Sequence, residues 1–164
     1  MVGGQSGVIA HMDEQTPIDG PEAIFRDPFI ENLVGNWTIT RRFGSREAIN
    51  LASAHWVLNH QFLQIHMKDA SDPPDYEAIV MIGYIHEELK YVAHWMDVFG
   101  GKFSSVGKGY LNGNSIEFTF QYDDGPFYNT FSWNESAGTW RCLLESVAGD
   151  GTRSFFCEDT LVRT

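Results

Sequence analysis

The sequence predicts an all-β protein, an antiparallel up-and-down barrel of about ten strands with a short helix before the first strand. Short runs rich in Val, Ile, Thr and aromatic residues alternate with polar residues at a period of two, as expected for half-buried strands. Clusters of Gly, Pro, Asn and Asp interrupt these runs roughly every 8 to 12 residues, and no connection suggests a long crossover. The 43% hydrophobic content and 16 glycines among 164 residues favour one well-packed, turn-rich domain.

The N-terminal residues differ in character from the rest of the chain. Residues 1–19 are polar and lack a hydrophobic period, which predicts a flexible tail, and residues 20–164 are predicted to form the single barrel domain. The sequence leaves open whether residues 1–11 are native or a cloning remnant ahead of a native start at Met12. A basic segment followed by an apolar stretch, as in a secretory signal, does not occur here, so we expect a cytoplasmic location.

A short helix and a series of strands follow this tail. Over residues 20–33 apolar residues recur at helical spacing, and Asp27-Pro28 can start a helix, so we expect a helical plug or lid. The dipeptide Asn112-Gly113 is predicted to occupy the centre of a type I′ hairpin turn, which requires positive φ angles. The predicted strands lie in residues 36–43, 48–58, 61–68, the two arms of a hairpin over 79–99, 104–111, 116–122, 127–133, 139–147 and 153–163.

The hairpin over residues 79–99 sets the register from which the two faces of the sheet are predicted. With Glu87 and Glu88 in its turn, Met81 lies opposite His94, and both are expected to point into the barrel. A barrel of about ten strands encloses more space than its side chains fill, so we expect a cavity. The predicted inward face consists of Trp37, Ile39, Arg41, Asn50, Ala52, Ala54, Trp56, Leu63, Ile65, Met67, Ile79, Met81, Val92, His94, Met96, Ile116, Phe118, Phe120, Asn129, Phe131, Trp133, Trp140, Cys142, Leu144, Phe155, Cys157, Asp159 and Leu161.

The chain resembles the calycin superfamily of lipocalin-like and fatty-acid-binding barrels. The resemblance rests on Gly35-Asn36-Trp37 at the start of the first predicted strand, after a short helix, and on Arg163 near the end of the last strand. In lipocalins the tryptophan of a Gly-x-Trp motif closes the barrel floor, and a basic residue packs over its ring through a cation–π contact. The resemblance therefore implies that Trp37 and Arg163 touch at one end of a closed barrel.

A second stretch is similar to a bacterial family of lipocalin-like barrels of unknown function. That family has a Gly-Tyr-Asp turn, then a tyrosine, then Trp-x-Asp, and the likeness covers about residues 30–163. The sequence departs from the Asp turn at Ile85 and His86. The resemblance implies a fold and supplies no reaction. The matching residues are Gly83, Tyr84, Tyr91, Trp95 and Asp97.

These features predict binding of a small, mostly apolar ligand inside the barrel. Arg41 and Asp159, both predicted to point inward, are expected to pair with each other or with Arg163. The alternative is that Arg41 holds a ligand carboxylate, as basic residues do in the fatty-acid-binding barrels that the chain resembles. Asn129 can orient a ligand by hydrogen bonding. The predicted ligand-binding residues are Arg41, Trp56, Met81, His94, Phe118, Asn129, Phe131 and Trp140.

An enzyme acting on a hydrophobic small molecule is the alternative, with His94 or Asp159 as acid or base. A buried His94 could equally ligate haem or a metal, or be a core histidine satisfied by a neighbour, and no cofactor is identified. Haem-binding calycins use a histidine from the end of the barrel, which His94 does not match. His60 and His66 are not expected to share a metal, since one lies in a turn and the other is predicted to face outward. A third possibility is a filled barrel that self-associates, and a homodimer is compatible with each reading.

The charge balance excludes several classes of partner. A net charge of −11 and an isoelectric point near 4.8 argue against nucleic acid and against anionic membranes, whose phosphates would be repelled. The simplest role for this acidity is solubility. No run of about 18 apolar residues occurs, so no transmembrane helix is predicted. The two cysteines, Cys142 and Cys157, are expected to stay reduced as small buried residues.

Overall fold

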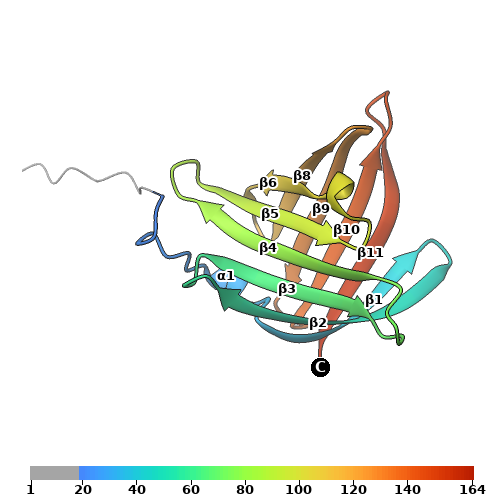
Figure 1. Ribbon diagram of the computed structural model, residues 1–164, viewed down its shortest axis with the longest axis horizontal. Coiled ribbons are helices and arrows are strands. Elements are labelled where there is room, and N and C mark those ends of the chain that lie inside the picture. Colours follow the sequence, from blue (N-terminus) through green and yellow to red (C-terminus); the bar gives the residue numbers. More distant parts are fainter. Residues whose placement is uncertain (1–18) are drawn as a thin grey trace, which may run out of the picture.

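The computed structural model describes residues 19–164, which form a closed antiparallel barrel preceded by a short helix (Figure 1). The elements are α1 (Pro28–Glu31), β1 (Gly35–Phe43), β2 (Arg46–Val57), β3 (Phe62–Asp69), β4 (Glu77–Ile85), β5 (Lys90–Asp97), η1 (Gly101–Phe103), β6 (Ser105–Gly109), β7 (Leu111–Asn112), β8 (Ser115–Tyr122), β9 (Gly125–Asn134), β10 (Thr139–Val147) and β11 (Arg153–Arg163). The predicted all-β barrel with a short N-terminal helix is confirmed. Of the tail predicted over residues 1–19, all but Asp19 lies outside the described residues.

The barrel is a meander in which strands adjacent in sequence are adjacent in space. The order around the wall is β6-β5-β4-β3-β2-β1-β11-β10-β9-β8, and β6 closes the circuit by pairing with β8. The two-residue β7 pairs with β8 outside this circuit. Figure 1 shows β2 to β5 crossing β8 to β11 steeply, as expected when a twisted sheet curls onto itself. The first and last strands, β1 and β11, therefore lie side by side.

The closure between β6 and β8 depends on two glycines. The two strands share one register pair, Lys108 with Thr119. A Cβ atom added at Gly107 would lie 2.7 Å from the Phe120 ring, and one added at Gly109 would lie 2.3 Å from the Glu117 carbonyl oxygen. Because real Cβ atoms do not approach other atoms so closely, the seam requires glycine at both positions.

One end of the barrel is sealed by α1 and the segment around it, and we call it the closed end. Asp27 caps the helix by accepting hydrogen bonds from the backbone N–H groups of Phe29 (2.7 Å) and Ile30 (3.2 Å). Trp37 donates its indole N–H to the Leu33 carbonyl at 2.7 Å, and the Arg163 guanidinium lies 4.4 Å from the centre of the Trp37 ring. The predicted helical plug and the predicted contact between Trp37 and Arg163 are both confirmed.

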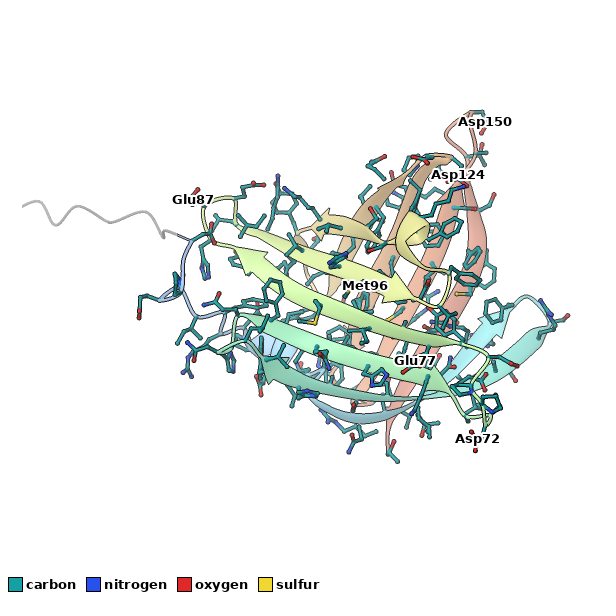
Figure 2. All side chains as sticks on the ribbon, in the orientation of Figure 1. Asp72, Glu77, Glu87, Met96, Asp124 and Asp150 are labelled. Atoms are coloured by element: carbon teal, nitrogen blue, oxygen red, sulfur yellow. The ribbon has the colours of Figure 1, made fainter. Side chains whose placement is uncertain are left out.

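Aromatic stacking joins the plug to the hairpin formed by β4 and β5. The buried Phe25 ring stacks on Tyr84 at 5.4 Å and meets the rings of Trp56 and Tyr91 at 5.5 and 6.0 Å. His86 is held to the same segment, since its Nε2 lies 3.1 Å from the Ala23 carbonyl oxygen. The turn that carries Glu87 in Figure 2 thus lies at the closed end.

The inward face predicted for the β4–β5 hairpin is wrong. The predicted pairing of Met81 with His94 is present, but Val80, Ile82 and Ala93 are the fully buried residues of these strands. The error arises in the connection before β4, because Ile65 pairs with Val80 and a shift of one residue exchanges the two faces of a strand. Five residues predicted inside are therefore on the outer face: Ile79, Met81, Val92, His94 and Met96. Met96 is labelled in Figure 2.

The turn near residue 112 is present but differs by one residue from the prediction. Asn112 pairs with Ser115, so Gly113 and Asn114 occupy the two turn positions. Gly113 has a φ of 61°, and neither Asn112 nor Asn114 has a positive φ. The predicted type I′ geometry is therefore wrong, and glycine alone supplies the left-handed conformation of this turn.

Candidate functional site at the open end of the barrel

The end of the barrel opposite α1 contains the candidate site, and we call it the open end. It is formed by the β1–β2, β3–β4, β8–β9 and β10–β11 connections together with the segment from β5 through η1 to β6. Asp72, Asp124 and Asp150 mark three of these turns in Figure 2. Four polar residues point into the barrel from the strands near this end and are buried. They form the buried polar cluster: Arg41, Asn50, Asn129 and Asp159.

Arg41 and Asp159 form a buried ion pair across neighbouring strands. The two residues are direct partners in the β1–β11 register, and their side chains are 6% and 2% exposed. Arg41 donates from Nε to Oδ1 at 2.7 Å and from Nη2 to Oδ2 at 2.6 Å, which is the bidentate geometry of strong guanidinium–carboxylate pairs. Burial alone would lower the pKa of Arg41, but the hydrogen bonds and charge of Asp159 outweigh burial and raise it. The expected pairing of these two residues is confirmed.

Tyr76 covers this ion pair from the β3–β4 connection. The Arg41 guanidinium lies 4.7 Å from the centre of the Tyr76 ring, a cation–π contact. The Tyr76 hydroxyl accepts a hydrogen bond from Trp95 Nε1 and donates one to Asp97 Oδ2, both at 3.3 Å. Burial raises the pKa of Tyr76, although the positive charge of Arg41 opposes that shift. Nothing in the run of turn-forming residues 69–75 singled Tyr76 out in advance, because its role depends on where the connection folds back.

Asn50 and Asn129 have buried amide atoms without hydrogen-bond partners. Both residues are 1% exposed, and Asn50 Nδ2 and Asn129 Oδ1 contact no partner among the described residues. Asn50 lies on β2, and Asn129 lies on β9 on the other side of the barrel. A buried polar atom left unpaired costs roughly 1–3 kcal/mol, so two of them inside one core are unusual. The sequence predicted a ligand-orienting role for Asn129, whereas Asn50 was only placed on the inward face.

Aromatic side chains surround the mouth of the open end. Phe99 is 67% exposed and lies 6.4 Å from Tyr76, while Phe103 lies 6.3 Å from Phe99. On the other side, the exposed Phe156 meets the half-buried Phe127 at 5.4 Å. Exposed phenyl rings around a buried polar cluster form an apolar rim that a small molecule would cross on entering.

A β-bulge positions one part of this rim. The β10–β11 register shifts between Leu144 and Glu145, so that Leu144 pairs with Cys157 but Glu145 pairs with Phe155. The extra residue, Phe156, is thereby free to turn toward Phe127, since bulges redirect side chains. The inward position predicted for Phe155 is wrong for the same reason: the shift pairs it with Glu145 on the outer face, where it is half exposed.

The residues predicted to line one cavity are dispersed over four regions. Arg41 and Asn129 belong to the buried polar cluster, and Phe118 and Phe131 pack edge to face at 5.7 Å in the core. The other four lie at the closed end or on the outer face.

Two of these four residues, the tryptophans, belong to the closed end. Trp56 donates its indole N–H to Glu31 at 2.7 Å and stacks on His60 at 3.9 Å. Trp140 meets Phe29 of α1 at 5.0 Å. Both rings therefore contribute to sealing the barrel floor and not to a wall shared with Arg41.

The last two, Met81 and His94, are on the outer face, so neither can contact a molecule inside the barrel. His94 Nε2 instead lies 2.8 Å from the Ser104 hydroxyl. The predicted interior position of His94 between two methionines is wrong, because the one-residue shift before β4 applies to the whole hairpin.

The remaining polar candidates serve local contacts. His66 is 2.5 Å from Glu77 in an outward-facing pair, and His60 Nδ1 is 2.8 Å from the Phe25 carbonyl oxygen. Within residues 19–164 no group of three or more His, Cys, Asp or Glu side chains is arranged to hold a metal ion. The same part of the chain has no helix long and apolar enough to cross a membrane.

The two cysteines are buried free thiols, as predicted. Cys142 and Cys157 lie on the inward faces of β10 and β11. Burial raises the pKa of Cys157 to about 12 and that of Cys142 well above its ordinary value. Because the thiolate is the reactive form, neither cysteine is suited to act as a nucleophile.

Two hollows on the protein surface lie outside the barrel. One, of about 460 Å³, is lined by residues near the β6–β8 seam such as Lys108, Glu117 and Thr130. The other, of about 1080 Å³, lies beside α1 and the β9–β10 turn and includes Trp133 and Arg141. Neither is lined by a member of the buried polar cluster, so they do not correspond to the predicted interior site.

The chain is similar in fold to a protein of known structure. No protein-family model matches the chain, and no curated protein matches its sequence. The crystal structure of Rv2717c from M. tuberculosis is similar, with a TM-score of 0.59 over 85% of this chain and 99% of that chain, at 10% sequence identity. At this identity the likeness concerns the barrel architecture alone. The chain thus has a closed ten-stranded antiparallel barrel of a kind seen in a solved structure.

Proposed function

We propose that the protein binds a small, largely aromatic or apolar molecule in the barrel interior beneath the open end. The observation that carries this proposal is the pair of unpartnered amide atoms, Asn50 Nδ2 and Asn129 Oδ1, in an interior whose other buried polar groups, Arg41 and Asp159, are paired with each other. A core that served packing alone would be more stable with leucine at these positions, because an unpaired buried amide loses its hydration without compensation. A ligand that enters the barrel and pairs with both amides would remove this penalty.

The residues around the cluster are suited to an aromatic ligand. Tyr76 from the β3–β4 connection and Trp95, Tyr122 and Phe127 from the strands are buried or half-buried at the open end. Apolar contact contributes about 25 cal/mol per Å² of surface removed from water, so these rings would supply most of the binding free energy. The amides and the ion pair would then fix the orientation of the ligand.

Catalysis by the two residues considered from the sequence has less support. His94 is on the outer face, away from the buried polar cluster. Both carboxylate oxygens of Asp159 accept hydrogen bonds from Arg41, so the carboxylate serves an ion pair instead of standing free as a base. Binding is therefore the function that the arrangement favours.

The proposal is tested by titration with N-phenyl-1-naphthylamine, an uncharged fluorescent probe whose emission rises in apolar sites. We expect saturable binding by the native protein and a loss of roughly tenfold in affinity for Asn129→Leu, the equivalent of one hydrogen bond. Asn36→Leu is the matched control, since Asn36 is exposed on β1. Absence of saturable binding by the native protein, or equal losses in both variants, would contradict the proposal and favour a filled core.

A further inference from the structure

The chemistry of the buried polar cluster also indicates which polar group a ligand carries. This inference rests on the proposed function. We infer that the ligand presents an uncharged group with both a hydrogen-bond donor and an acceptor, of the carboxamide or lactam type, and that the site discriminates against carboxylates. This differs from the fatty-acid-binding barrels that the sequence resembles, in which a basic residue holds a carboxylate.

Asp159 neutralises the charge of Arg41. The two side chains form a bidentate pair at 2.6 and 2.7 Å, and both are almost fully buried. The charge of Arg41 is therefore already balanced. A ligand carboxylate that displaced Asp159 would break a buried ion pair, and one that bound the remaining Nη1 donors would be a second buried anion beside a single cation.

Neighbouring side chains restrict access to the Arg41 guanidinium. The Tyr76 ring lies 4.7 Å from the guanidinium carbon, and Nη2 of Arg41 also lies 3.8 Å from the Met67 sulfur. The hydroxyl of Tyr76 is itself held by Trp95 and Asp97. A molecule arriving from the open end therefore meets an aromatic face and the Asp97 carboxylate before any N–H group of Arg41.

The balance of charge at the open end also disfavours an anionic ligand. Arg41 and Asp159 cancel, while Asp97 adds a negative charge close to Tyr76 and Tyr122. Burial raises the pKa of Tyr122, and the charge of Asp97 raises it further. Lys102, at the same end, is exposed and lies over Phe103 at 5.6 Å, outside the buried polar cluster. The cluster therefore has no free positive charge that could pair with an anionic ligand. Burying an unpaired anion in an apolar interior is costly.

The two unpaired amide atoms differ in their hydrogen-bonding chemistry. Asn50 offers an N–H donor and Asn129 offers a carbonyl acceptor. A carboxamide or lactam carries a matching partner for each kind of atom, a carbonyl oxygen for the Asn50 donor and an N–H group for the Asn129 acceptor. A carboxylate has acceptors only, so it would leave Asn129 Oδ1 facing a negatively charged oxygen. The donor and acceptor set therefore selects an uncharged amide-like group.

The test compares 2-naphthamide with 2-naphthoate, which have the same ring and nearly the same shape but differ in charge and in donor content. Isothermal titration calorimetry at neutral pH should give a dissociation constant at least about tenfold lower for the amide. Asn129→Leu should weaken naphthamide binding about tenfold and leave naphthoate unchanged. Asp159→Asn should strengthen naphthoate binding about tenfold or more, because the charge of Arg41 is then uncompensated and attracts an anion.

A second variant covers the possibility that Asp159→Asn does not fold. Arg41→Met with Asp159→Leu removes both charges together, which proteins tolerate better than removal of one. If the amides select the ligand, this double variant keeps its preference for naphthamide. Loss of naphthoate binding in the double variant, starting from measurable binding in the native protein, would show that Arg41 holds anions and would overturn the inference.

The outcomes separate this inference from the proposed function. Equal or tighter binding of naphthoate by the native protein overturns the amide inference and leaves small-molecule binding intact. Binding of N-phenyl-1-naphthylamine without binding of naphthamide has the same consequence. Failure of all three probes to bind contradicts the proposed function itself, and the inference with it.

Discussion

The two ends of this barrel each contain an arginine beside an aromatic ring, but they use it differently. At the closed end, Arg163 covers Trp37 from outside and donates to the carbonyl oxygens of Val34 (2.9 Å) and Asn32 (3.1 Å). At the open end, Arg41 is buried under Tyr76 and paired with Asp159. The first arrangement ties a plug to the barrel floor, and the second places charge inside the barrel.

The ends also differ in how completely their polar atoms are paired. At the closed end the indole N–H groups of Trp37 and Trp140 reach backbone carbonyls, and the Tyr91 hydroxyl bonds to Asp27. At the open end two buried amide atoms have no partner among residues 19–164. The closed end therefore has the hydrogen bonds expected of a stable seal, whereas the open end retains unpaired amide atoms with which a ligand could form hydrogen bonds.

The largest expected effect comes from breaking the ion pair at the open end. Asp159→Leu leaves Arg41 charged and buried without a partner, which should lower the free energy of unfolding by about 3–5 kcal/mol. The matched control is Glu158→Leu on the same strand, because Glu158 pairs with the exposed side chains of Arg42 and Arg141. That control should lose about 1 kcal/mol or less. Urea unfolding measures both, and equal losses would refute the assignment of a buried pair.

A smaller effect is expected from loosening the closed end. Asp27→Ala removes the cap of α1 and the partner of Tyr91, and should lower the free energy of unfolding by about 1–2 kcal/mol. The affinity for N-phenyl-1-naphthylamine should be unchanged, because the proposed site is at the other end. A change in stability and affinity by similar amounts would show that the two ends are not independent.

The unpartnered amides should give an effect of opposite sign. Asn50→Leu and Asn129→Leu each remove a buried unpaired atom, so the free energy of unfolding should rise by about 1 kcal/mol in the absence of ligand. Asn36→Leu on the exposed face of β1 should change stability little. Destabilisation by both interior leucines would mean that the amides support the fold, and would remove the main argument for a ligand.

The effect that is smallest at neutral pH is the one arising from the thiols, which appears only as the pH rises. Burial raises the pKa of Cys157 to about 12 from an ordinary value of 9.0, so the folded state retains its proton longer than the unfolded state. The corresponding stability is present below pH 9.0 and decreases as the pH rises toward 12. Cys157→Ala should flatten the slope of unfolding free energy against pH in the lower part of this range. An unchanged slope would contradict the shift.

Much of this architecture could be predicted from local sequence patterns. Period-two alternation and turn-forming clusters located the strands, because each strand buries one face and each turn needs residues that tolerate its backbone angles. The contact of Trp37 with Arg163 and the pairing of Arg41 with Asp159 were both expected, and both connect the first strand to the last. Two of the four residues of the buried polar cluster, Arg41 and Asn129, were predicted as ligand-binding residues, and Asp159 was considered only as an acid or base of the enzyme alternative.

The tertiary structure decided which features belong together. His94 and Met81 pair as expected but face outward, since the connection before β4 sets the register of the whole hairpin and no local pattern fixes that register. Tyr76 covers Arg41 only because the β3–β4 connection folds back over the barrel mouth. Whether a buried amide finds a partner depends on atoms contributed by distant strands, so the unpaired state of Asn50 and Asn129 is a property of the closed barrel and not of either residue's neighbours in sequence.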